Sequence, residues 1–280
     1  MRIIRDVISR SNNNYFELIV GLFKAAQELH AYFRSTLKKD VRPVVFLRDD
    51  IFDLLRDNDK PKWEDKKVDL NWNSLMLRDF LAFRINKAAG SSDPPDFREN
   101  WQRVFSVETT RTNNRHNRTT TTMNYILRST YMRPRDVISY VRAAAKLALN
   151  QGDDRIDNPI IKDAERLHSG FMRNEIIAEM YPVVPHVSEI LDMLAELRKV
   201  IVTRKEFNDN YRNLVKQIHS DGAFINEQRA LDFLFYFGAI GNVTTGSNHQ
   251  IFRYDSPRAK YNRRENICVH RSLLKSLDIY

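Results

Sequence analysis

The chain has 280 residues and carries 45 lysines and arginines against 36 aspartates and glutamates, a formal net charge of +9. Hydrophobic residues make up 42% of the chain, which suffices for a buried core and excludes a globally disordered protein. The single cysteine, Cys268, excludes an intramolecular disulfide framework and a cysteine-based zinc site. No apolar run approaches the roughly 18 residues of a membrane span, and the first residues contain no signal-peptide hydrophobic region. The sequence therefore predicts a soluble, cytoplasmic protein without a membrane partner.

The N-terminal part contains the pattern of an α/β unit. A helix is expected over residues 15–33, where apolar side chains recur at steps of three and four. The continuous apolar run Val44–Leu47 follows, and such a run is typical of a strand that is buried on both faces of a parallel sheet. Shorter elements are expected beyond it: helices over residues 51–56 and 74–87, and a strand over residues 68–70.

The rest of the chain is predicted to be mainly helical. Residues 109–122 contain no apolar side chain, and a loop is expected there. Thr203 and Glu206 have the spacing of a capping box at a helix start. Helices are expected over residues 134–149, 158–180, 187–197, from residue 203 onward, and over 226–237, the last one ending at Gly238. Short strands over residues 243–245, 250–254 and 266–270 complete a series of helices followed by a hairpin, which is the pattern of a winged helix.

Sites for common chemistry are mostly excluded. Gly241 and Gly246 have the spacing of P-loop glycines, but Ser247 stands where the loop requires lysine, so a hairpin turn is expected there. The seven histidines are scattered and form no zincin-type pair. The sequence therefore predicts no catalytic residue and no metal ligand in this chain.

An ordered series of segments carries a family resemblance. The expected strand Val44–Leu47 delivers Arg48 and Asp49 to its carboxyl end. The later segments are residues 101–105, 125–130, 133–138, 237–241, 252–254 and 269–274. In this order the segments resemble a family of bacterial P-loop ATPases related to AAA-type and STAND-type ATPases, which often occur beside mobile-element or phage-defence genes. The resemblance covers nearly the whole chain and rests on order and spacing, not on one motif.

The resemblance implies nucleotide-sensing residues. Arg48 holds the position of a polar sensor residue, with Asp49 after it, and Arg135, or else Arg133, corresponds to a second sensor arginine at the entry of a helical lid. The alternative is that Arg48 and Arg135 pair with surface carboxylates. The family's Walker A loop and Walker B acid have no counterpart in this chain. We therefore expect a C-terminal part that is inactive alone and takes ATP and Mg²⁺ only when the upstream part is supplied.

The resemblance also implies the domain organisation. Residues 1–96 correspond to the C-terminal part of the ATPase α/β core, residues 97–182 to a helical lid region, and residues 183–280 to a winged-helix-like domain. The expected fold class is mixed α/β and mainly α-helical.

A basic cluster near the C-terminus indicates nucleic-acid contact. It consists of Arg253, Arg258, Lys260, Arg263 and Arg264, with Tyr254 and Tyr261 interleaved. The helix over residues 226–237 is nearly continuously apolar and is expected to be buried, so the preceding helix, with Lys205, Arg212 and Lys216, is the better groove candidate. Two alternatives stay open: a winged-helix nucleic-acid-binding regulator without nucleotide chemistry, and a helical adaptor that binds partner proteins or itself.

Overall fold

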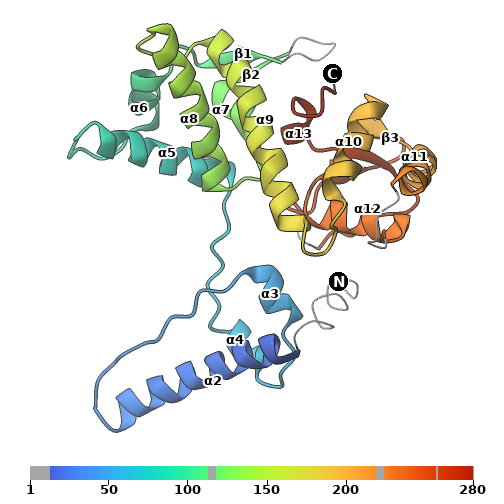
Figure 1. Ribbon diagram of the computed structural model, residues 1–280. Coiled ribbons are helices and arrows are strands. Elements are labelled where there is room, and N and C mark those ends of the chain that lie inside the picture. The colour runs from blue at the N-terminus through green and yellow to red at the C-terminus, as the bar shows by residue number, and fades with distance from the viewer. Residues whose placement is uncertain (1–12, 113–117, 219–223, 257, 280) are drawn as a thin grey trace. The chain divides into compact units, whose positions relative to one another are not determined.

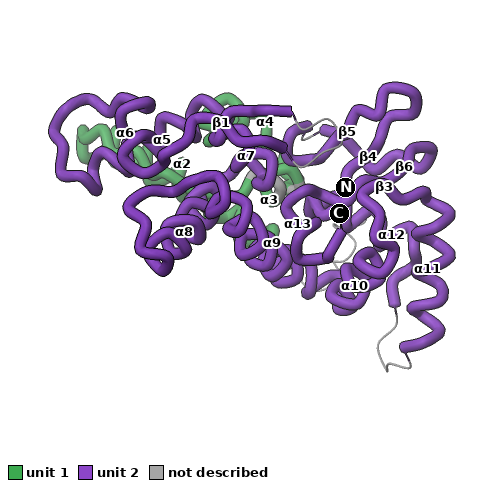
Figure 2. The backbone as a smooth tube through the Cα atoms, turned by 90° about the horizontal axis from the view of Figure 1, so that it is seen from above, with its two compact units in different colours: residues 1–70 green, residues 71–280 purple. Residues whose placement is uncertain are grey.

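The structure is a computed structural model that describes residues 13–112, 118–218, 224–256 and 258–279 (Figure 1). The chain divides into two compact units, Met1–Leu70 and Asn71–Tyr280, which Figure 2 colours separately. The described residues are mainly helical with small antiparallel sheets, which confirms the expected mixed, mainly α-helical class. The domain boundaries after residues 96 and 182 stay predictions. Within the described ranges, no helix is both long enough and apolar enough to cross a bilayer.

The first unit consists of one long helix and two short ones. These are α2 (Asn13–Ser35), α3 (Asp49–Leu54) and α4 (Lys60–Glu64). Its small core joins Ile19 of α2 to Phe52, Leu55 and Trp63, and Phe23 stacks on Trp63 at a ring-centroid distance of 4.9 Å. The apolar periodicity that predicted a helix over residues 15–33 is therefore confirmed.

The expected strand Val44–Leu47 is wrong for the described residues. Residues 38–48 contain no helix and no strand, and the side chains of Val44 and Phe46 are 72% and 82% exposed. A strand requires a hydrogen-bonded neighbour, and the described residues of this unit contain no other strand. The strand expected over residues 68–70 is absent as well, with Val68 and Leu70 exposed.

The second unit begins with a group of packed helices. They are α5 (Ser74–Ala88), α6 (Phe97–Val104), α7 (Thr122–Leu127), α8 (Pro134–Gln151) and α9 (Asn158–Met180). Helices α8 and α9 run side by side (Figure 1). Their shared core includes Leu77, Trp101, Tyr140 and Ile161, so α5 packs within this unit.

The loop expected over residues 109–122 is wrong at both ends. Strands β1 (Thr109–Arg111) and β2 (Thr119–Thr121) pair antiparallel, and Thr110 faces Thr120. Threonine favours strands because it is β-branched, and the buried hydroxyl groups of Thr110 and Thr122 lie 3.0 Å apart in a hydrogen bond. The hairpin of β1 and β2 was therefore not predicted, because these residues show no apolar pattern.

The C-terminal part of the second unit combines helices with a four-stranded antiparallel sheet. Its elements are α10 (Val187–Leu197), β3 (Ile201–Val202), α11 (Arg204–Gln217), α12 (Glu227–Tyr236), β4 (Ile240–Val243), β5 (Gln250–Ile251), β6 (Asn266–Val269) and α13 (Arg271–Leu274). The strand order is β3-β6-β4-β5. The capping box of Thr203 and Glu206 is present, and Gly238 follows α12 with a left-handed φ of 82°. The two-residue strand β3 and the four-residue helix α13 were not predicted.

Candidate nucleic-acid interface

One buried side chain fixes residues 258–264, hereafter the basic segment, to the sheet. Asn242 of β4 is 3% exposed, donates from Nδ2 to the Lys260 carbonyl at 2.8 Å, and accepts at Oδ1 from the Asn262 N–H at 3.0 Å. The neighbouring Gly241 allows β5 to approach, because a Cβ there would lie 2.8 Å from the ring of Phe252. The basic segment therefore leaves the sheet at a defined place.

Four cations project from the basic segment. Arg258, Lys260, Arg263 and Arg264 are all exposed, and within the described part of the chain none of them has an ion-pair partner. Arg253 differs, since its guanidinium lies 3.9 Å from the centroid of the Tyr236 ring of α12. The predicted cluster therefore separates into four available cations and one arginine that is engaged in packing.

Arg204 links the basic segment to both neighbouring helices. At the start of α11, its Nη1 donates to the Arg263 carbonyl at 3.4 Å and its Nη2 donates to Gln228 Oε1 of α12 at 3.1 Å. Its Nε is buried without a hydrogen-bond partner, as is the hydroxyl group of Tyr261. The first turns of α11 and α12 and the basic segment therefore meet at Arg204.

Helix α12 is a poor candidate for entering a nucleic-acid groove. Leu231, Phe233, Leu234 and Phe235 are buried, which confirms the expected burial of this helix. On α11, Arg212 pairs with Glu227 at 3.0 Å, so its charge is partly neutralised. Two further cations of α11, Lys205 and Lys216, are exposed. Exposed cations are therefore offered mainly by the basic segment and by α11, whereas α12 contributes Arg229 alone.

A buried aromatic cluster packs against the sheet. His270 shares hydrogen bonds with Ser272 Oγ at 2.7 Å and with the Tyr254 hydroxyl group at 3.1 Å, and its ring lies 4.5 Å from that of Tyr131. Burial lowers the pKa of His270 to about 3 and raises the pKa of the Tyr254 hydroxyl group. His270 is therefore neutral at physiological pH. Tyr254 points into this cluster and does not extend the basic surface.

The predicted nucleotide-sensing residues lie in separate units. Arg48 precedes α3, where its carbonyl accepts from the Phe52 N–H at 3.0 Å, and Asp49 is the first residue of that helix. In the second unit, Arg135 Nη2 lies 2.5 Å from a carboxylate oxygen of Glu175. Arg133 Nη1 lies 3.3 Å from Glu179. Carboxylates of α9 thus neutralise both arginines at the start of α8.

A buried charged cluster on α9 was not predicted from the sequence. Glu165 is 3% exposed and accepts hydrogen bonds from the Tyr125 hydroxyl group at 2.8 Å and from Ser129 Oγ at 3.2 Å. Arg128 and Arg271 approach the same carboxylate from α7's C-terminal end and from α13. The available signal was an acidic residue inside the apolar stripe of a predicted helix. Its partners could not be predicted, because they lie far away in the chain.

Comparisons with known proteins bear on the helical part of the second unit. Residues 75–177 match a family model described as the FunZ-associated C-terminal helical domain. This range includes α6, α7 and α8 and nearly all of α5 and α9. No curated protein and no solved structure gives a significant match. The match suggests that this chain is a C-terminal part of a larger protein.

Proposed function

We propose that this chain is the C-terminal portion of a bacterial P-loop ATPase of the AAA/STAND-like, defence-associated kind. The observation that carries the proposal is the uncovered apolar surface of the first unit. Leu18, Leu22 and Leu29 of α2 are at least half exposed, on a different face from the packed Ile19 and Phe23. Such an apolar surface in so small a unit is typical of a contact with further protein.

The irregular segment after α2 also leaves an apolar side chain uncovered. Phe46 is exposed and Leu47 packs on the small core, and the N–H groups of residues 44–47 make no backbone hydrogen bond within the described ranges. His30 Nδ1 contacts the Val41 carbonyl at 2.8 Å, which ties this segment to α2. A sheet supplied by an upstream part would pair with Val44–Leu47 and cover α2. An upstream sheet would therefore account both for the exposed leucines of α2 and for the N–H groups of residues 44–47 that lack a backbone hydrogen bond.

Nucleotide chemistry is assigned to the upstream part. The present chain has no glycine-rich loop followed by lysine to hold phosphates, so ATP and Mg²⁺ do not fit these residues alone. In the larger protein Arg48, with Asp49, would follow the completed strand. Arg135, or else Arg133, would act as the second sensor only after exchanging its carboxylate partner, Glu175 or Glu179, for phosphate oxygens.

The test is ATP hydrolysis by the larger protein and by this chain. We expect turnover only with the upstream part, and a loss of about tenfold or more in Arg48→Ala, because a guanidinium would no longer face the phosphates. Arg98→Ala is the matched control, since Arg98 is exposed and pairs with Glu108. An upstream region without a P-loop, or turnover by the present chain alone, would contradict the proposal.

A second function, nucleic-acid binding, is favoured by the four available cations of the basic segment. The order of α10, β3, α11, α12, β4 and β6, with an antiparallel sheet, supports a winged-helix domain, in which the basic segment between β5 and β6 would form part of the wing. Exposed arginines and lysines bind phosphates, and this binding weakens steeply with salt. We therefore assign the basic segment to contact with the nucleic-acid backbone, without base specificity.

The matched experiment exchanges two sets of four cations for glutamine. The test set is Arg258, Lys260, Arg263 and Arg264, and the control set is Arg84, Arg142, Lys146 and Arg155, which are also exposed. Both variants lose four charges, so only the location differs. We expect the test variant to lose most affinity for duplex DNA or RNA and the control to lose little. Equal losses, or binding without salt dependence, would favour the adaptor alternative.

A further inference from the structure

Helix α5 is apolar on two faces. Its inner face packs in the core of the second unit through Leu77, Leu81 and Ile85, of which the first two are buried. Its outer face carries Met76 and Phe83, which are 44% and 47% exposed. A helix that packs on one side only normally shows polar residues on the other side, and a helix that is apolar all round is normally covered all round. The outer face of α5 therefore lacks a cover among the described residues.

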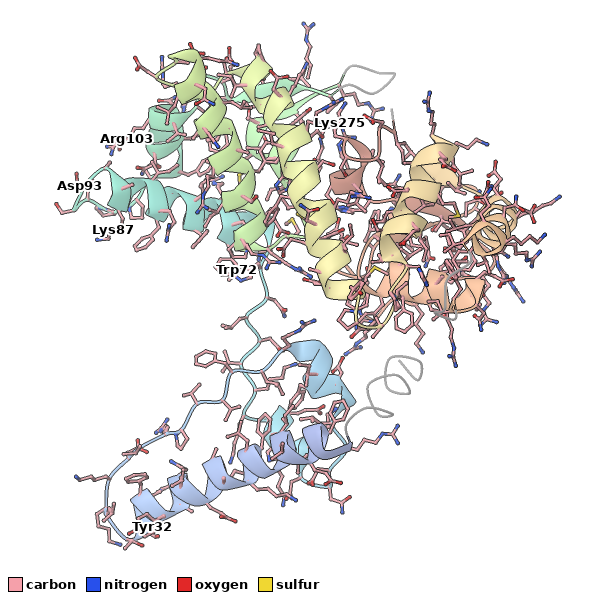
Figure 3. The ribbon with its side chains drawn as sticks, in the orientation of Figure 1. Tyr32, Trp72, Lys87, Asp93, Arg103 and Lys275 are labelled. Atoms are coloured by element: carbon pink, nitrogen blue, oxygen red, sulfur yellow. The ribbon has the colours of Figure 1, made fainter. Side chains whose placement is uncertain are left out.

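The outer face is one continuous apolar row. Trp72, just before the helix, packs edge-on against Phe80 at a ring-centroid distance of 5.5 Å. Met76 lies between these two residues in the sequence, and Phe83 follows them. Steps of three and four place all four residues on the same side of the helix, hereafter the α5 stripe. Trp72 and Lys87, labelled in Figure 3, stand near the two ends of α5.

Two opposite charges flank the α5 stripe. Asp79 and Arg84 are exposed, and neither has an ion-pair partner within the described ranges. The nearby Arg78 differs, because its guanidinium lies 4.6 Å from the centroid of the Phe97 ring of α6. Since about 3.6 residues make one helical turn, Asp79 and Arg84 lie on opposite sides of the stripe. The stripe therefore has an acidic edge and a basic edge.

The spacing of these residues is that of a heptad seam. The core positions a and d of a heptad alternate at steps of three and four, and Met76, Phe80 and Phe83 fit positions d, a and d. Asp79 and Arg84 then occupy g and the following e. When two such helices pair in parallel, g of one helix faces the following e of the other, and opposite charges there set the orientation. In an antiparallel pair g faces g, which brings like charges together.

We propose that a second copy of this chain covers the α5 stripe, with the two α5 helices parallel about a two-fold axis. Met76, Phe80 and Phe83 of both copies form the seam, and Asp79 of each copy pairs with Arg84 of the other. The occupant is a second copy because the charge pattern complements itself in this arrangement. The contact is the same surface on both copies, as a two-fold axis requires.

The seam is short. Lys87 takes the next a position, and a lysine at a specifies the register at a cost in stability. Only the part of α5 from Met76 to Phe83 is therefore apolar at both core positions. We expect a dimer that dissociates on dilution.

The experiment is sedimentation equilibrium of the full chain with charges reversed on α5. All variants also carry Leu22→Gln and Phe46→Gln, so that the apolar surface of the first unit does not contribute. Asp79→Arg and Arg84→Asp should each weaken dimerisation about tenfold or more, because each brings like charges together at both edges of the seam. The combination of Asp79→Arg with Arg84→Asp should restore dimerisation, because both ion pairs form again with reversed sign.

A second set of variants tests the apolar seam. Met76→Gln combined with Phe83→Gln should abolish the dimer and leave the helical content unchanged, since both side chains are exposed. The controls lie on α8. Arg142→Asp makes the same charge change as Arg84→Asp at another exposed position, and Leu149→Gln replaces an apolar residue that is 76% exposed. Neither control should change dimerisation.

A cysteine in the seam tests the direction of pairing. Met76→Cys at position d places two thiol groups side by side in a parallel dimer, so mild oxidation should yield a covalent dimer. The chain's own cysteine, Cys268, is buried and does not compete. Leu149→Cys is the matched control and should not crosslink.

The outcomes decide the proposal. Rescue by the combined charge reversal, together with crosslinking of Met76→Cys, supports it. A monomeric chain at every concentration would overturn it, as would a folded combined charge reversal that does not dimerise or unchanged dimerisation in Met76→Gln with Phe83→Gln. A dimer in which Met76→Cys does not crosslink would overturn the parallel arrangement. None of these measurements involves ATP or nucleic acid, so their failure leaves the proposed function untouched.

Discussion

The two units of this chain bury their apolar residues to different degrees. In the first unit, α2 exposes a row of leucines and Phe46 is nearly fully solvent-accessible. In the second unit, even the short helix α12 buries Phe233 and Phe235 against the sheet region. The two units follow the same physical rules, so the difference teaches that, among the described residues, the second unit supplies partners for a large core and the first supplies them only for a small one.

The largest expected effect is the response of the second unit to acid. Burial lowers the pKa of His168 to about 4 and that of His270 to about 3, against about 6.5 in an unfolded chain. The unfolded state therefore binds more protons, and stability falls as pH drops from about 6.5 toward 4. Each histidine contributes roughly 3 kcal/mol of this loss. Hydrogen exchange at pH 7 and pH 4.5 should show the second unit destabilised more than the first.

The matched variants for this prediction are His168→Gln and His270→Gln. Each should flatten the pH dependence of unfolding in the second unit, because glutamine does not titrate in this range. An unchanged slope in both variants would show that the histidines do not cause the acid response.

The next effect compares two phenylalanines. Phe235→Ala should destabilise the second unit by about 3–5 kcal/mol, since the side chain is buried and leaves a cavity. Phe46→Ala, at an exposed position of the first unit, should change the free energy of unfolding by less than about 0.5 kcal/mol. Urea unfolding measures both values. Similar losses would break the contrast between the units.

A smaller effect concerns the support of the basic segment. Asn242→Ala removes both side-chain hydrogen bonds to this segment and should destabilise the second unit by about 1–3 kcal/mol. Nucleic-acid affinity should fall as well, since the cations lose their fixed position. Unfolding curves and a binding titration of the same preparation check the two outcomes. Full affinity in a destabilised variant would show that the segment binds without this support.

The smallest change in stability, within about 0.5 kcal/mol, is expected for Leu22→Gln combined with Phe46→Gln. Both side chains are exposed, so the fold should persist while the apolar surface shrinks. Sedimentation velocity should show less self-association than in the unaltered chain. Unchanged self-association would show that the chain associates through a surface other than the one that contains Leu22 and Phe46.

The sequence predicted those parts of the fold that depend on local signals. Helix α9 was expected over residues 158–180 and spans Asn158–Met180, because proline and an apolar stripe mark it. The capping box at Thr203 was confirmed for the same reason. The predicted strand Val44–Leu47 is wrong because a strand depends on neighbours that the described residues do not supply. Strands β1 and β2 were not predicted because their threonine-rich segments contain no apolar pattern.

The sites were predictable to a smaller extent. The basic segment was found because its cations are close in sequence, although Arg253 turned out to pack on Tyr236. Glu165 and its two arginines were missed, because Arg128 and Arg271 meet only after α13 docks on α9. Contacts between residues so far apart in the chain require the fold.

The measurement that tests the central claim most directly is hydrogen exchange of Val44–Leu47, in this chain and in the larger protein with its upstream part. The account predicts rapid exchange in the present chain, because these N–H groups have no backbone acceptor within the described ranges. It predicts strong protection in the larger protein, where carbonyl groups of a neighbouring strand would accept hydrogen bonds from them. Rapid exchange in both would contradict the claim that the first unit is part of a larger α/β core.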